Sequence, residues 1–170
     1  MANISNKAVQ MPASAIRKLV PLADAAKKEG VKVYHLNLGQ PDIKSPTCAL
    51  DAIRNFSGEN VSYSHSAGLM DLRKGLVEKY YGKMGINISV DELIVTVAGS
   101  ESVNLALEIT CNPGDEVIVL EPFYTNYNTF AFMNGLTLKA ISTDIRNGFQ
   151  IPPIEEFEKA ITDKTKAILV

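Results

Sequence analysis

Apolar and polar positions follow two different periods along this chain, and the period separates the expected helices from the expected strands. Before residue 31, apolar residues recur every three or four positions, as on one face of a helix, and Gly30 is placed to end that helix. The same spacing predicts further helices after Pro46, over 69–83, 101–110 and 124–133, and after Pro153. Short apolar runs rich in β-branched residues predict strands over 33–38, 93–97, 116–120, 136–141 and 167–170.

Strands and helices alternate regularly from residue 93 onward. Such alternation is typical of crossover connections, which produce a mostly parallel sheet with helices on both faces. The expected fold class is therefore α/β. Ligands of these sheets bind beyond the carboxyl ends of the strands, so the loops after Val97 and Leu120 are where the sequence predicts a site.

The chain ends at Val170, inside an apolar run that is expected to form a strand and that carries no polar tail. An unfinished strand exposes unpaired backbone groups. We therefore expect the sequence to be the first part of a longer chain.

Composition narrows the classes of function. The 170 residues are 46% hydrophobic and 21% charged, a globular balance that can form one sizeable core. The net charge is -2 and the basic residues form no cluster, which gives no support for nucleic-acid binding. There is no signal-peptide pattern and no apolar run near the ~20 residues that span a bilayer. We expect no membrane association and a cytoplasmic location.

The cysteines and histidines suggest no metal site. Cys48 and Cys111 lie far apart, and neither belongs to a Cys-x-x-Cys pair. We expect two small buried thiols rather than a disulfide or metal ligands. His35 and His65 are isolated, and we assign neither a metal nor a catalytic role.

Residues 96–102 join a predicted strand directly to a predicted helix. Free N–H groups at a helix start attract anions together with the helix dipole. Gly99 lets a phosphate approach the backbone closely, and the hydroxyls of Ser100 and Ser102 can donate or cap. Taken alone, a strand-helix junction with a glycine and two serines is more often a plain helix cap than an anion-binding site. The segment matches neither G-x-G-x-x-G nor G-x-x-x-x-G-K-[ST], so dinucleotide and P-loop sites lose their main support.

An aromatic cluster follows the next predicted strand, at Phe123, Tyr124 and Tyr127. An aromatic side chain in this place can lie flat on a planar heteroaromatic ligand. The alternative is that all three rings simply pack against the helix that follows. Taken alone, such a cluster is more often explained by this packing than by a ligand. Two further turn-rich segments, 36–42 and 63–69, allow plain turn chemistry as well.

Taken in order, these four segments resemble class I and II aminotransferases of fold type I, the aspartate aminotransferase superfamily. The matching residues are Leu38-Gly39-Gln40-Pro41-Asp42, Tyr63 ahead of Gly68 and Leu72-Arg73, Val95-Thr96-Val97-Ala98-Gly99, Pro113-Gly114-Asp115-Glu116-Val117, Pro122-Phe123-Tyr124 and Lys166-Ala167-Ile168. The resemblance covers nearly the whole chain. It implies an N-terminal arm and small-domain segment over 1–45, and the first, incomplete part of the large, cofactor-binding domain over 46–170.

The resemblance implies pyridoxal 5'-phosphate (PLP) as the cofactor and a transaminase activity. The amino group would move between an amino acid, with aspartate or a related one as a candidate, and a 2-oxo acid. Ala98, Gly99 and Ser100 match the loop that binds the PLP phosphate through backbone amides, and Tyr124 matches the residue stacked on the pyridine ring. Ala98 stands where many relatives have Ser or Gly, and Tyr124 replaces the Trp of typical aspartate aminotransferases.

Three further roles follow from the same resemblance. Tyr63 matches a tyrosine that reaches the phosphate of the partner subunit's cofactor, which implies a homodimer with shared active sites. Gly39 matches a glycine whose backbone contacts the substrate carboxylate, and Ile16 lies in a segment that borders the substrate pocket.

We assign no catalytic residue to this chain. In the family, the catalytic lysine, the aspartate at the pyridine nitrogen and the arginine for the substrate carboxylate follow the strand that begins near Lys166. We therefore expect residues 1–170 alone to be inactive. Two alternatives remain open: a β-lyase or decarboxylating relative of the same fold, and a non-catalytic aminotransferase-like domain used as a sensor or dimerisation module.

Overall fold

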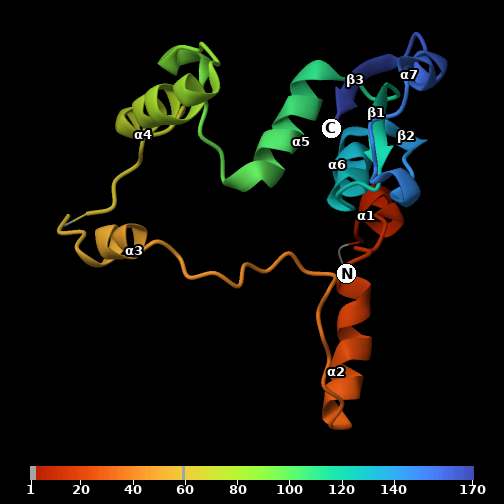
Figure 1. Ribbon diagram of the computed structural model, residues 1–170, viewed down its shortest axis with the longest axis horizontal. Coiled ribbons are helices and arrows are strands. Elements are labelled where there is room, and N and C mark those ends of the chain that lie inside the picture. Colours follow the sequence, from red (N-terminus) through yellow and green to blue (C-terminus); the bar gives the residue numbers. More distant parts are fainter. Residues whose placement is uncertain (1–2, 59) are drawn as a thin grey trace. The chain divides into compact units, whose positions relative to one another are not determined.

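The computed structural model describes residues 3–58 and 60–170 (Figure 1). They form two compact units. The first, the sheet unit, comprises the chain up to Leu38 together with Val103–Val170, and the second, the helical unit, comprises Gly39–Ser102.

The sheet unit begins with short helices: α1 (Asn6–Gln10), the 3-10 helix η1 (Arg17–Leu19) and α2 (Val20–Lys28). Ser5 caps α1, because its hydroxyl accepts a hydrogen bond from the Ala8 N–H at 3.1 Å. Gly30 follows α2 with a φ of +82°, a conformation that glycine adopts without strain. The predicted end of this helix is confirmed.

The strand predicted over 33–38 is wrong. These residues are irregular, and Leu36 is 96% exposed. A β-branched run becomes a strand only where a neighbouring strand accepts and donates its backbone hydrogen bonds. Within the described residues, no strand pairs with this segment.

The centre of the sheet unit is a parallel sheet of three strands: β1 (Glu116–Glu121), β2 (Thr137–Ser142) and β3 (Thr165–Leu169). Their order is β2-β1-β3, so β1 is the central strand. Val117, Ile118 and Val119 are completely buried. Because successive side chains of a strand point to opposite faces, both faces of β1 are covered. The predicted α/β class with a parallel sheet is confirmed.

Helices connect and cover these strands. The chain passes from β1 to β2 through α6 (Asn126–Asn134), and from β2 to β3 through the 3-10 helix η5 (Ile145–Asn147) and α7 (Ile154–Ala160) (Figure 1). The core combines Leu107 of α5 (Ala98–Thr110), Val117 of β1, Ala131 of α6 and Leu136. Partly buried residues surround it: Val103, Cys111, Phe130, Leu138, Ala167 and Leu169.

The helical unit contains α3 (Thr47–Arg54), α4 (Met70–Gly75), a π-helical stretch η2 (Leu76–Tyr81), and 3-10 turns η3 (Gly82–Met84) and η4 (Val90–Glu92). The predicted helices after Pro46 and over 69–83 are thus present. Arg73 is 4% exposed, and its guanidinium donates to the Val90 carbonyl at 2.8 Å. This hydrogen bond ties α4 to η4.

The strand predicted over 93–97 is also wrong. The segment is irregular in structure, although the Val95 N–H donates to the Ala67 carbonyl at 3.0 Å. A single hydrogen bond of this kind makes no ladder, and a strand requires consecutive pairs with a neighbour.

The two cysteines are free thiols in different surroundings. Cys111 is half-buried beside the core, so it has only part of the expected burial, whereas Cys48 is exposed on α3. The expectation that both are buried is wrong for Cys48, because α3 contains no buried residue. Across residues 3–58 and 60–170, no helix combines the length and apolar character needed to cross a bilayer.

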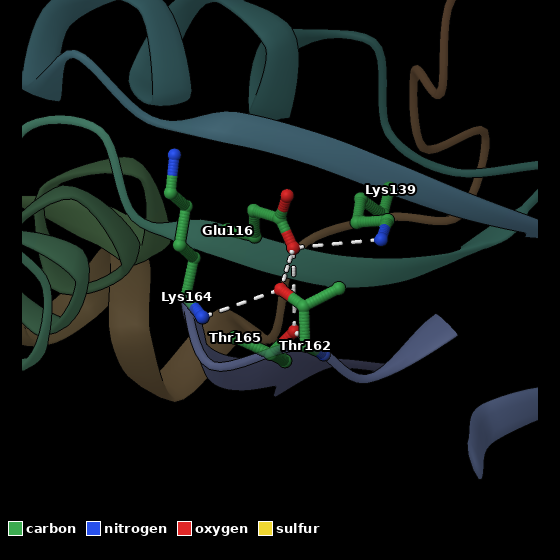
Figure 2. Close-up of polar contacts among 5 residues, drawn as sticks. All are labelled: Glu116, Lys139, Thr162, Lys164 and Thr165. Carbon is green, nitrogen blue, oxygen red and sulfur yellow. Dashed lines mark hydrogen bonds and ion pairs between the residues drawn. The ribbon is translucent and has the colours of Figure 1, made fainter. Parts of the chain in front are cut away.

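Glu116 links all three strands at their amino ends (Figure 2). Its carboxylate accepts a hydrogen bond from the Thr162 hydroxyl at 2.6 Å, and lies 3.5 Å from both the Lys139 ammonium on β2 and the Thr165 hydroxyl on β3. The Thr162 hydroxyl is itself bonded to the Lys164 N–H at 3.2 Å. The Thr162 hydrogen bond, with a smaller contribution from the Lys139 charge, holds the pKa of Glu116 below its ordinary value, although desolvation opposes this.

Candidate functional site

The start of α5 is shaped by a small network of side chains. The Thr96 hydroxyl lies 3.1 Å from the Ala98 carbonyl and 2.5 Å from the Ser102 hydroxyl. The Glu101 carboxylate accepts a hydrogen bond from the Val97 N–H. These contacts fix the turn by which the segment over 93–97 enters the helix, three residues earlier than the sequence pattern predicts.

Ala98 has a φ of +62°, in the left-handed region. This conformation costs an L-residue roughly 1–2 kcal/mol. Strain of this kind persists where the surrounding structure imposes it, and it is concentrated at functional sites. The strain at Ala98 therefore marks the turn before Gly99 as a candidate functional segment, in which the structure imposes the direction of the backbone.

The amide groups that follow Ala98 are open to a ligand. Ala98, Gly99 and Ser100 are exposed, and a Cβ placed on Gly99 would meet no heavy atom within 4 Å. The first N–H groups of a helix have no acceptor within the helix. A phosphate fits here because the backbone is accessible and α5, with 13 residues, has an appreciable dipole. Ala98 offers no hydroxyl, and its backbone N–H already donates to the Thr96 carbonyl at 3.0 Å, so Gly99 and Ser100 carry the open amides.

The segment over 63–69 lies against the segment that leads into α5. Gly68 has a φ of +95°, and a Cβ there would approach the Val95 side chain to 2.6 Å. Only glycine allows this close approach. Together with the hydrogen bond from Val95 to Ala67, it brings Val95, four residues before Gly99, next to the end of the segment over 63–69.

The loop after β1 places aromatic rings in a defined arrangement. The rings of Phe123 and Tyr127 are stacked, with centroids 6.3 Å apart and an interplanar angle of 6°. Tyr127 also meets the Tyr124 ring edge-on, at 5.6 Å and 90°. Phe123 and Tyr127 are half-buried, but Tyr124 remains 47% exposed. Packing thus explains the first two rings, and Tyr124 keeps surface for another partner.

The remaining predicted residues occupy less ordered segments. Tyr63 is fully exposed in an irregular stretch of the helical unit, and Gly39 begins that unit with open space around it. Ile16 is half-buried directly before η1 in the sheet unit. It follows residues 12–15, which face α6 across a cleft of about 380 Å³.

The predicted residues therefore fall into two groups. The helical unit contains Gly39, Tyr63 and the run 98–100, while the sheet unit contains Tyr124 and Ile16. A second cleft of about 400 Å³ runs beside the Tyr124 loop, between Phe123 and Thr143. Tyr124 does not line this cleft, so it is not the surface on which a stacked ring would lie.

Sequence reasoning missed one residue of this loop, Asn126. Its side-chain amide donates to the Tyr124 hydroxyl at 2.6 Å. An asparagine near a helix start is ordinarily taken as a cap, and the sequence contains no signal that would direct it to a phenol two residues earlier.

The chain belongs to the class I and II aminotransferase family, whose model matches residues 31–170. It is 31% identical to the aspartate/prephenate aminotransferase of Thermus thermophilus over its whole length, and 30% identical to the aspartate aminotransferase of Thermotoga maritima over 98% of it. It spans 44% of the length of each of these two relatives.

Solved structures agree with this assignment. A mutant of Thermus thermophilus aspartate aminotransferase matches the whole chain with a TM-score of 0.90 at 32% identity, the match covering 44% of that protein. The alanine aminotransferase of Pyrococcus furiosus matches 98% of the chain with a TM-score of 0.85 at 34% identity, covering 43% of that protein.

Proposed function

We propose that the full-length product of this gene is a PLP-dependent transaminase, and that residues 1–170 supply its phosphate loop and ring-stacking aromatic. The observation that carries the proposal is the open, exposed helix start at Gly99, in a chain that belongs to an aminotransferase family. The relatives include enzymes named for aspartate, prephenate and alanine. A substrate pair of an amino acid and a 2-oxo acid is common to all of these, and we assign no narrower specificity.

The residues of this chain bind and orient the cofactor. The backbone N–H groups of Gly99 and Ser100 donate to the phosphate, the Ser100 hydroxyl adds a further donor, and the dipole of α5 favours the negative charge. Tyr124 covers one face of the pyridine ring. When bound, PLP supplies an electron sink for the substrate carbon that carries the amino group.

Other residues complete the pocket in this proposal. The Gly39 backbone contacts the substrate carboxylate, and Ile16 borders the substrate pocket. Tyr63 reaches the phosphate of the partner subunit's cofactor, so the protein is a homodimer with shared sites. Residues 1–45 form the arm and small-domain segment, and 46–170 form the first part of the large domain. None of these residues moves the proton; the family's catalytic lysine has no counterpart among them.

We also propose a cytoplasmic location for the protein. Two cysteines in 170 residues, both free thiols, suit a reducing compartment. Free amino acids and 2-oxo acids are available there to an enzyme of this kind.

The proposal is tested by comparing PLP with pyridoxal, which lacks the phosphate, as ligands of the full-length protein. We expect PLP to bind much more tightly. Gly99→Asp should weaken PLP binding by roughly tenfold or more, because it places a carboxylate at the phosphate loop, and should leave pyridoxal binding almost unchanged. Affinities are measured by absorbance titration, and amino transfer to 2-oxoglutarate is assayed alongside.

Ser57→Asp is the matched control, since it adds the same charge at an exposed residue of the same unit. It should change neither affinity. Equal binding of PLP and pyridoxal by the parent protein, or equal losses in the two Asp variants, would contradict the phosphate loop.

A further inference from the structure

The Tyr124 side chain is restrained at both ends. Its backbone is held by a turn in which the Tyr127 N–H donates to the Tyr124 carbonyl at 2.9 Å. Its hydroxyl, at the far end of the ring, accepts the hydrogen bond from the Asn126 side-chain amide at 2.6 Å. The two restraints act on one ring that is otherwise 47% exposed.

The backbone of Asn126 is held by the helix that it begins. Asn126 is the first residue of α6, and its side chain is half-buried. The helix therefore sets the direction from which the amide reaches Tyr124. The Tyr127 ring, edge-on to Tyr124, limits its tilt from a second direction.

We propose that Asn126 is a positioning residue for the cofactor, acting through the hydroxyl of Tyr124. This inference rests on the proposed function, in which Tyr124 stacks on the PLP ring. A phenol whose tip is anchored can still turn about its long axis, but it cannot swing to another χ1 rotamer without breaking the hydrogen bond. The ring is thus in place before the cofactor arrives, and binding no longer has to order it.

The polarity of the hydrogen bond has a second consequence. Because the Tyr124 oxygen accepts from Asn126, the phenol proton is not used in that bond. It remains available to an acceptor on a bound ligand. A tryptophan at this position has no oxygen to accept from Asn126, so this anchor is specific to a tyrosine.

The test is a double-mutant cycle on the full-length protein, with Asn126→Ala, Tyr124→Phe and the double variant. The readouts are the dissociation constant of PLP and the visible circular dichroism of the bound cofactor, which reports how its ring is held. We expect Asn126→Ala to weaken PLP binding by about three- to tenfold and to reduce the dichroism, since an unordered ring must be fixed on binding. In the Tyr124→Phe background, Asn126→Ala should have no further effect.

Two control variants distinguish the loss of the hydrogen bond to Tyr124 from a general effect of substitution at the start of α6. Asn126→Ser keeps a small polar residue at the start of α6 but is too short to reach the phenol, so it should behave as Asn126→Ala does. Asn128→Ala removes an asparagine from the same helical turn without touching Tyr124, and should bind PLP like the parent.

The outcomes separate the two proposals. Unchanged PLP binding by Asn126→Ala, or a loss that persists in the Tyr124→Phe background, overturns the positioning role while leaving the proposed function intact. A parent protein that does not bind PLP overturns the proposed function, and the positioning role falls with it.

Discussion

At the scale of single residues, two positions of the proposed site are held by local constraints that their residue types do not reveal. Tyr124 is anchored through its hydroxyl by Asn126, and Ala98 occupies a left-handed conformation that glycine would adopt at lower cost. The first constraint orders a side chain and the second orders the backbone. Both constraints are present before a ligand binds, so both reduce the loss of conformational freedom on binding.

Ala98→Gly should stabilise the protein. Glycine removes the roughly 1–2 kcal/mol cost of the positive φ. Its greater conformational freedom in the unfolded chain destabilises the folded protein by about 0.5–1 kcal/mol. The expected net gain is about 0.5–1 kcal/mol, measured by urea unfolding of the full-length protein.

The control for this substitution is Ala106→Gly, inside α5. There the same change should destabilise by about 1 kcal/mol, because a helix interior disfavours glycine. Opposite signs are the expected result, and a loss of stability in both variants would show that the strain at Ala98 costs little.

At the scale of elements, the strands are joined by polar as well as apolar contacts. The buried Val117–Val119 run places β1 at the centre of the sheet, and Glu116 links its amino end to β2 and to the segment before β3. Thr162 is 46 residues away from Glu116 in the sequence. The carboxylate thus restrains three separate segments from one position.

Glu116→Gln should lower the Tm at neutral pH, by a few degrees, because the ion pair with Lys139 is lost and the Thr162 hydrogen bond weakens. The pKa of Glu116 is depressed in the folded state, so its carboxylate contributes stability above the ordinary value of 4.5, and this contribution is lost as pH falls through the lower folded value. The difference in Tm between parent and variant should therefore shrink below about pH 4.5.

Glu78→Gln, at an exposed position inside the continuous helix formed by α4 and η2, provides the comparison for this pH series. Its Tm should follow that of the parent throughout. A Glu116→Gln difference that stays constant from pH 7 to acid would mean that the charge of Glu116 contributes nothing.

At the scale of the whole molecule, we propose a site that two subunits share. Tyr63 is fully exposed within its unit, which suits a side chain that acts on a neighbouring subunit in the proposed homodimer. The chain spans 44% of the length of the Thermus thermophilus aspartate/prephenate aminotransferase.

Tyr63→Phe should weaken PLP binding several-fold, because one hydroxyl donor to the phosphate is lost while the ring is kept. Tyr34→Phe, which removes a hydroxyl from another exposed tyrosine, should bind PLP normally.

If the sites are shared, PLP affinity of the parent should also fall when the protein is diluted until dimers dissociate, as followed by titration and sedimentation together. Concentration-independent binding by monomers would refute the shared site.

The sequence by itself determined the positions of most helices, the three strands of the sheet and the α/β class. It also predicted the candidate segments around Gly99 and Tyr124, which stay predictions. These features depend on local properties: the period of apolar residues, and the turn chemistry of residues such as Gly30. The tertiary structure decided which apolar runs become strands. The runs over 33–38 and 93–97 have the composition of strands but no ladder, because pairing is supplied by neighbours and not by the run itself. It also decided the left-handed turn at Ala98, the anchoring of Tyr124 by Asn126 and the contacts of Glu116, since each depends on how the chain directs one group toward another in space.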